Sequence, residues 1–166
     1  MQNSLLTMTT EFSYARLLEE LSTACPHGHG PTDAANWLAE MVVAEKINAI
    51  YGSDYEPHPN CRKEGIDLVS KSGKWPPIQL KHAKDDSQRD RKSRATIISK
   101  ALKEAKVEGF NRALFGAYQI RNGKLNKLFL GDVKQLGGGV KSELSKEGIS
   151  WIQLREWGFT EVRCAN

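Results

Sequence analysis

Three polar side chains are spaced so that they could do chemistry together on one hairpin. Asp67 interrupts the apolar run of residues 65–69, and Gln79 and Lys81 stand two apart in a second run, residues 78–81. Side chains two apart in a strand point to the same face, so the pattern predicts that this polar face lies opposite four core positions: Ile66, Leu68, Ile78 and Leu80. Buried charge is costly unless it is paired or bound to a metal. Asp67 and Gln79 offer the oxygen ligands that Mg²⁺ prefers, and Lys81 would lie beside the ion, where it can stabilise a phosphate or orient an attacking water.

The same two runs carry a family resemblance. G-I-D-L-V followed by I-Q-L-K resembles the core motif of the PD-(D/E)XK nucleases, and it is most similar to the Mrr-type restriction endonucleases, in which Gln replaces the second acid. The resemblance implies that Asp67 and Gln79 bind Mg²⁺, for which Mn²⁺ can substitute, and that Lys81 is the catalytic lysine. It also implies a catalytic, metal-binding glutamate on the preceding helix; Glu40 fits this role best and Glu45 is the reserve. The chain departs from the family pattern in having no Pro before Asp67.

The resemblance also implies a fold and an activity. The fold is α/β with a restriction-endonuclease-like core, a mixed β-sheet flanked by helices. The activity is that of a Mg²⁺-dependent DNA endonuclease acting on double-stranded DNA, most similar to a small, sequence-specific type II restriction enzyme. Cutting both strands needs two active sites, so a homodimer or higher homo-oligomer is expected. A homing endonuclease, a Holliday junction resolvase and a non-catalytic DNA-binding subunit stay open, as does a hairpin whose polar face is simply solvated.

A basic cluster follows the second strand. Three acids dilute it: Asp85, Asp86 and Asp90. Because the cluster comes directly after Lys81, we interpret it as a contact surface for the DNA backbone, which positions a duplex without reading its sequence. A solvated charged face is the alternative. The candidate DNA-binding residues are Lys84, Arg89, Arg91, Lys92 and Arg94.

Cysteine and histidine residues near the N-terminus suggest a second, weaker metal hypothesis. The set has irregular spacing that matches no standard zinc pattern, so a glycine-rich loop with incidental histidines is the favoured interpretation. The set comprises Cys25, His27, His29, His58 and Cys61. By strand alternation His82 is expected in the core rather than in the site. Trp151 and Trp157 are expected to be core or interface residues.

Length and composition indicate a single globular domain. The chain has 166 residues, a formal net charge of +4 and a sequence pI near 9.0, which is compatible with a nucleic-acid partner. We expect one nuclease domain: an N-terminal helix and loop (1–33), a catalytic core (34–136) and a C-terminal extension (137–166). An odd, scattered set of three cysteines favours the reducing cytoplasm. No apolar run reaches membrane-spanning length, and the first ten residues do not resemble a signal peptide.

The expected elements follow from hydrophobic periodicity and from the positions of Gly and Pro. A helix that is apolar nearly all round, and therefore buried, is expected from residue 32 or 33 to about residue 51. The Asn-Gly pair at residues 122–123 predicts a hairpin, and residues 137–139 are expected to form a linker. The remaining expected helices are 11–24, 93–108 and 142–146, and the expected strands are 65–70, 77–82, 113–120, 125–131 and 149–154.

Overall fold

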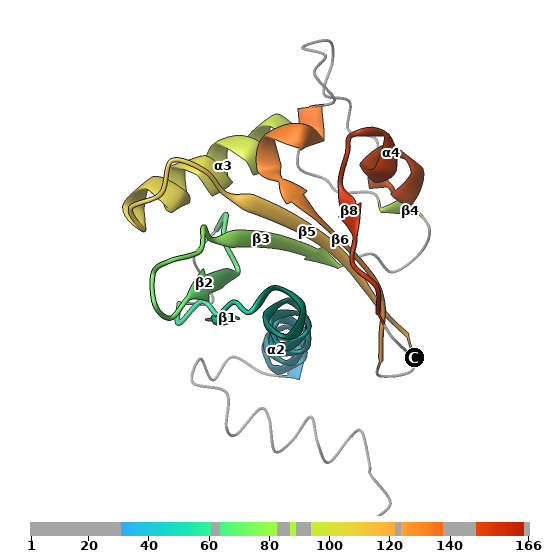
Figure 1. The fold of residues 1–166 in the computed structure, drawn as a ribbon, viewed down its shortest axis with the longest axis horizontal. Coiled ribbons are helices and arrows are strands. Elements are labelled where there is room, and N and C mark those ends of the chain that lie inside the picture. The colour runs from blue at the N-terminus through green and yellow to red at the C-terminus, as the bar shows by residue number, and fades with distance from the viewer. Residues whose placement is uncertain are drawn as a thin grey trace, which may run out of the picture.

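The computed structural model describes residues 31–60, 64–82, 87–88, 94–121, 124–137 and 149–164. A six-stranded mixed sheet forms the middle layer of this part of the chain. Helix α2 (Pro31–Tyr51) lies on one face, and α3 (Arg94–Val107) and α4 (Trp151–Glu156) lie on the other (Figure 1). The expected α/β class, with a mixed sheet flanked by helices, is confirmed. The expected segments 11–24, 138–139 and 142–146 lie outside the described residues.

The order of the strands combines a meander with one crossover. The first three strands of the sheet pair antiparallel, and β3 then pairs in parallel with β5, with α3 forming the connection between them. A parallel pair requires such a crossover, and a helix usually supplies it. Two further strands, β4 (Ser87–Gln88) and β7 (Ile149–Ser150), pair separately. The sheet order is β1 (Tyr55–Pro57), β2 (Leu68–Ser70), β3 (Ile78–His82), β5 (Leu114–Arg121), β6 (Lys124–Asp132) and β8 (Thr160–Glu161).

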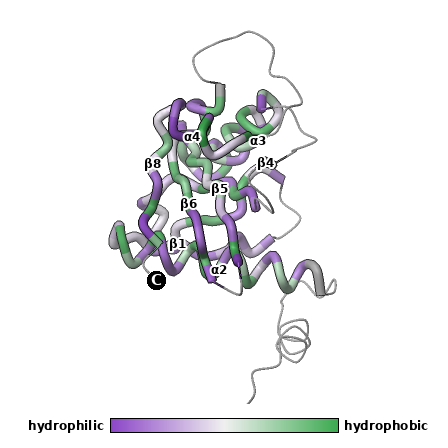
Figure 2. Tube along the Cα trace, turned by 90° about the vertical axis from the view of Figure 1, so that its right-hand side faces the viewer, coloured by the Kyte–Doolittle hydropathy of each residue, from purple (hydrophilic) through white to green (hydrophobic). Residues whose placement is uncertain are grey.

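Each face of the sheet has its own hydrophobic core. On the α2 face, Val43, Ala44 and Ile47 pack with residues of the central strands, and on the α3 face the largest buried side chains are Phe115 and Phe129. The four positions expected in the core from strand alternation are all buried: Ile66, Leu68, Ile78 and Leu80. The burial expected along the hairpin is therefore confirmed. Figure 2 shows that β5 and β6 become hydrophilic toward their shared hairpin end.

Helix α2 is less buried than its sequence suggested. Its fully buried positions are Ala34, Val43, Ala44 and Ile47, whereas Ile50 and Tyr51 are exposed. The expectation of burial on all sides was wrong, because only one side of α2 meets the sheet. Among the described helices, α2 alone covers this face (Figure 1).

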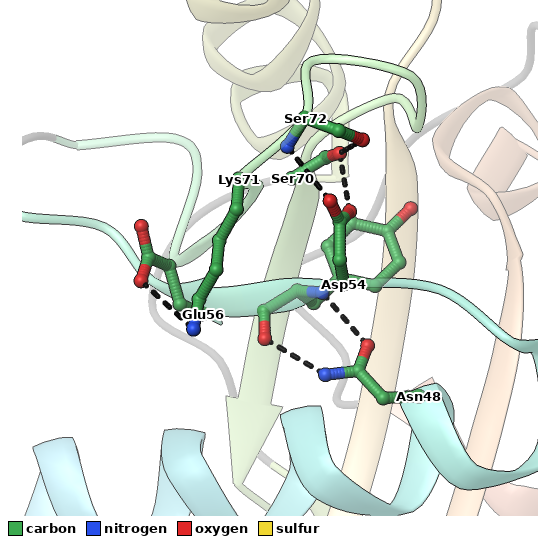
Figure 3. Close-up of polar contacts among 7 residues, drawn as sticks. Asn48, Asp54, Glu56, Ser70, Lys71 and Ser72 are labelled. Atoms are coloured by element: carbon green, nitrogen blue, oxygen red, sulfur yellow. Dashed lines mark hydrogen bonds and ion pairs between the residues drawn. The ribbon is translucent and has the colours of Figure 1, made fainter.

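A set of polar side chains attaches α2 to the first two strands (Figure 3). Asn48 binds both backbone groups of Tyr55: its Nδ2 donates to the carbonyl at 2.9 Å, and its Oδ1 accepts from the N–H at 2.7 Å. Asp54 accepts from the Ser70 hydroxyl and from the Ser72 N–H, and these hydrogen bonds lower the pKa of its carboxyl. The Asn48 side chain thus binds the backbone of the edge strand β1 as a neighbouring strand would, and this holds α2 against β1.

The segment predicted as a last strand is mostly a helix. Residues 149–154 begin with the two residues of β7, and α4 then runs from Trp151. Ser150 and Gln153 form a capping box, in which each side chain binds the other residue's backbone N–H. Trp151 and Leu154, three apart, are both buried, and Trp151 stacks on Phe129. Its expected core role is confirmed, but the strand prediction was wrong because the spacing is helical. The strand that enters the sheet is β8.

Crossing a bilayer requires a helix that is both long and apolar. None of the helices among the described residues meets both requirements.

Candidate active site

Asp67 is held where β2 and β3 separate. It lies just before β2 rather than in the middle of a strand, although its N–H still donates to the Ile78 carbonyl at 2.8 Å. Its carboxylate then turns to β3, where Oδ2 accepts the Leu80 N–H at 2.6 Å. Only one residue pair, Leu68 with Ile78, is in register between these strands. The side chain of Asp67 therefore binds a β3 backbone donor beyond the last registered pair.

A close approach to α3 fixes the chain just before Asp67. Gly65 has a φ of +111°, and a Cβ there would lie 2.9 Å from the carbonyl carbon and oxygen of Lys100. Glu64 forms an ion pair with the Lys100 ammonium beside it. Only glycine adopts this backbone conformation at little cost and leaves room for α3. Glycine at position 65 thus allows the chain to pass close to α3 just before Asp67.

Gln79 lies against Asp67 as the alternation predicted. Its side chain is 7% exposed, and its Nε2 donates both to Asp67 Oδ2 and to the Leu80 carbonyl, at 3.0 Å for the latter. The predicted proximity of Asp67 and Gln79 is therefore confirmed. The amide presents its nitrogen to the carboxylate. Half a turn of the amide about its last bond would present Oε1 instead.

Glu40 is the acid that α2 contributes. Burial, and then the nearby negative charge of Asp67, raise the pKa of Glu40 to about 8. Glu40, Val43, Ala44 and Ile47 follow a spacing of three and four residues, so they share the helix face that meets the sheet. Glu45 lies off that face and is exposed. Of the two candidate glutamates, the structure brings Glu40 to Asp67.

Lys81 follows Gln79 on the last part of β3. The two residues share a strand face by alternation, and in the parallel pair with β5 Lys81 stands opposite Ala117. Its side chain is partly exposed, unlike that of Gln79. Lys81 therefore follows the contact between Gln79 and Asp67 by two residues along β3, at the more exposed end of the strand.

Tyr118 also belongs to this region, although sequence reasoning missed it. It is 5% exposed, and burial together with the charges of Glu40 and Asp67 raises the pKa of its hydroxyl. His82 stacks on its ring at a centroid distance of 5.1 Å. His82 itself is exposed at the end of β3, so the expectation that it lies in the core was wrong. Tyr118 had no local signal, because it reaches the site only through the pairing of β3 with β5.

The predicted DNA-binding cluster lies mostly outside the described residues. Lys84, Arg89, Arg91 and Lys92 fall there, and only Arg94 is described. Arg94 begins α3, where its Nη1 donates to the Leu136 carbonyl at 3.2 Å and its guanidinium lies 4.8 Å from the Trp157 ring centroid. These contacts give Arg94 a packing role within the protein. Contact with DNA stays a prediction for all five residues.

The zinc hypothesis also falls mostly outside the described residues. Cys25, His27, His29 and Cys61 are not described, whereas His58 is. The Nδ1 of His58 accepts the Asn60 N–H at 2.9 Å, and its Nε2 lies 3.6 Å from a carboxylate oxygen of Glu108. The described histidine is therefore held by neighbours in the protein.

The donor set of the site has the chemistry that a divalent cation needs. Within the described ranges, no three His, Cys, Asp or Glu side chains gather as a metal site; the set here has two carboxylates and one amide. The two carboxylates are close enough for Asp67 to raise the pKa of Glu40, and a cation between them would relieve that repulsion. All three side chains can present oxygen, the ligand atom of Mg²⁺. The residues fit such an ion once Glu40 loses its proton and the Gln79 amide turns.

No protein-family model matches the chain, and no curated protein matches it.

Proposed function

We propose that this protein is a Mg²⁺-dependent DNA endonuclease that hydrolyses phosphodiester bonds. The observation that carries the proposal is Asp67, which accepts from the Gln79 amide of β3 and raises the pKa of Glu40 on α2, with Lys81 two residues further along β3. Two carboxylates that repel each other in a partly buried site are costly for folding alone. They are useful where a cation and a phosphate must be bound together.

Each side chain has a distinct part in the proposed reaction. Water attacks the phosphorus, the bond to the leaving oxygen breaks, and that oxygen takes up a proton. Asp67, Glu40 and Gln79 would hold Mg²⁺, which when bound polarises the phosphate and lowers the pKa of water. Lys81 stabilises the negative charge that grows on the phosphate oxygens, or orients the water. Leu80 keeps Asp67 oriented through its backbone N–H.

The order of the elements supports the same proposal. Helix α2, the meander of β1, β2 and β3, the crossover helix α3 and the parallel strand β5 follow one another along the chain. This order is similar to the helix–strands–helix–strand core implied by the resemblance to PD-(D/E)XK nucleases. Because one fold serves many functions, the fold adds support only alongside the site residues.

The proposed substrate is double-stranded DNA, and the proposed assembly is a homodimer acting on a two-fold symmetric target as a type II restriction enzyme does. One chain offers one candidate site, and two strands must be cut. A homing endonuclease or a Holliday junction resolvase would use the same site chemistry on a different DNA structure. A non-catalytic DNA-binding subunit would not require Lys81.

The deciding experiment incubates the full chain with linear plasmid, phage DNA and a four-way DNA junction in Mg²⁺, followed by sequencing of the ends. Defined ends on linear duplexes support the restriction activity, whereas cleavage of the junction alone supports the resolvase. The matched control replaces an exposed lysine of α3 in Lys103→Ala, which should cut normally while Lys81→Ala does not. Equal cleavage by both variants, or none by the unaltered protein in Mg²⁺ or Mn²⁺, would overturn the proposal.

A further inference from the structure

A cavity lies near the C-terminal end of α2. It has a volume of about 340 Å³ and is bounded by the end of α2, the turn before β3, the start of β5 and the end of β6. Ile47, Leu114 and Leu130 supply apolar side chains. Three aromatic residues also line it: Tyr51, Tyr55 and Trp75. This volume is at the small end of the range for ligand pockets.

Two of these aromatic residues are exposed, whereas Tyr55 is buried. Tyr51 is 44% exposed and Trp75 is 37% exposed, although both line a cavity that also contains the buried side chain of Ile47. Large aromatic surfaces that stay in water beside a pocket are typical of sites that stack a planar ligand. The cavity therefore offers aromatic surface to a flat ring.

Arg112 and Asp132 form an ion pair that lines the same cavity, but their charged groups do not hydrogen bond to each other. Arg112 Nε lies 3.6 Å from Asp132 Oδ2, which is too long for a hydrogen bond. The Asp132 carboxylate is held in place, because its Oδ1 accepts the Lys134 N–H at 3.0 Å. The side chains of Arg112 and Asp132 are 55% and 29% exposed. A ligand could thus meet a guanidinium donor and a carboxylate acceptor side by side.

From this combination we propose that the cavity binds a guanine base. Guanine is planar, and it carries acceptors at O6 and N7, which suit an Arg guanidinium, and donors at N1 and N2, which suit a carboxylate. Arg112 and Asp132 provide these two partners, and Tyr51 and Trp75 provide the stacking surface. The base can belong to a free nucleotide or to an unpaired position in DNA, since both present the same chemistry.

This cavity is separate from the candidate active site. Its α2 residue Ile47 follows Glu40 by two turns of helix, about 10 Å. Leu114, which lines the cavity, pairs with the first residue of β3, whereas Lys81 is the fourth residue of that strand. The inference does not depend on the proposed nuclease activity.

Calorimetric titration tests the inference on the full chain carrying Lys81→Ala, which keeps any DNA probe intact. We expect GMP to bind at least tenfold more tightly than AMP or CMP. Asp132→Asn keeps the size of the side chain and an acceptor for Lys134 but removes the charge, so it should abolish the preference for GMP. Trp75→Ala should weaken the binding of all nucleotides, and Trp75→Phe should keep most of the affinity that Trp75→Ala loses.

The control is Ile152→Ala, which removes an exposed apolar side chain of α4 and should bind GMP normally. Single-stranded oligonucleotides ending in dG or dA separate the two sources of the base: tight binding of the dG oligonucleotide with weak GMP binding assigns the site to DNA. Equal affinity for all nucleotides, no binding of either GMP or the dG oligonucleotide at millimolar concentration, or an unchanged preference in Asp132→Asn would each overturn the inference. Thermal unfolding of every variant separates a loss of binding from a loss of folding.

Discussion

The Leu80 N–H donates to Asp67 Oδ2 at 2.6 Å, so a side chain of one motif segment satisfies the backbone of the other. Asp67 also accepts from the Gln79 amide. The residue proposed to bind the metal is thus part of the hydrogen bonding that holds the hairpin together. Stability and catalysis should therefore be coupled at Asp67 and separable at Lys81.

The first prediction compares these two residues. Asp67→Ala and Lys81→Ala should each lower the cleavage rate by several orders of magnitude, because both act on the transition state. Asp67→Ala should also lower the free energy of unfolding by about 1–3 kcal/mol, since it leaves the Leu80 N–H without its acceptor and removes one of the two acceptors of the Gln79 amide. Urea unfolding and single-turnover cleavage measure the two effects. A stable, inactive Asp67→Ala protein would contradict the predicted coupling.

The second prediction concerns pH. The pKa of Glu40 is raised to about 8 in the folded protein, so between pH 4.5 and 8 the folded state holds a proton that the unfolded state has released. The contribution of Glu40 to the free energy of unfolding is fully present below pH 4.5. It falls as pH rises toward 8, by at most about 1.4 kcal/mol per pH unit. Glu40→Gln should flatten this slope in urea unfolding curves. Glu45→Gln, on the exposed side of α2, should leave it unchanged.

The third prediction tests the close approach before the site. Gly65→Ala must place a Cβ against the backbone of α3 at a φ of +111°, so it should destabilise the fold and impair cleavage. Gly73→Ala is the matched control, because its φ of +66° is also positive but nothing lies within 4 Å of a Cβ there. The free energy of unfolding of the control should fall only by the cost of placing a side chain at positive φ, about 1–2 kcal/mol. Equal losses in thermal unfolding would show that the approach to Lys100 is unimportant.

The fourth prediction concerns the metal. Cleavage should require Mg²⁺ or Mn²⁺, stop in EDTA, and slow in Ca²⁺, which accepts looser ligand geometry. Gln79→Glu should retain activity, since it supplies a charged oxygen ligand at the same position. Binding of Mg²⁺ near neutral pH should also release protons, because Glu40 must lose its own. Calorimetry in buffers of different ionisation enthalpy measures that release; cleavage that continues in EDTA would refute the metal-dependent mechanism.

The fifth prediction separates two arginines of the basic cluster. Arg91→Glu should weaken DNA binding and reduce the slope of log affinity against log salt by about one unit for each phosphate that the protein no longer binds. Arg94→Glu should instead destabilise the protein, because Arg94 binds the Leu136 carbonyl and lies over Trp157. Fluorescence anisotropy at several salt concentrations, with thermal unfolding alongside, measures both. An unchanged slope in Arg91→Glu would identify the cluster as a solvated face.

The hairpin of the site could be predicted from the sequence alone. Strand geometry makes neighbouring side chains alternate, so the burial of Ile66, Leu68, Ile78 and Leu80 and the meeting of Asp67 with Gln79 followed from spacing. The short helix α4 could also have been recognised locally, from its capping box and from Trp151 and Leu154 three apart. Such signals depend only on residues close together in the chain.

Only the tertiary structure decided which other residues join them. Glu40 rather than Glu45 reaches Asp67 because packing selects which side of α2 meets the sheet, and both glutamates lie on an apolar helix. Tyr118 comes to His82 through the parallel pairing of β3 and β5, which is set by the crossover helix between them. Helix faces and strand partners are fixed by contacts between distant segments. Local periodicity determines where a side chain points on its own element, and packing of the elements determines what it meets.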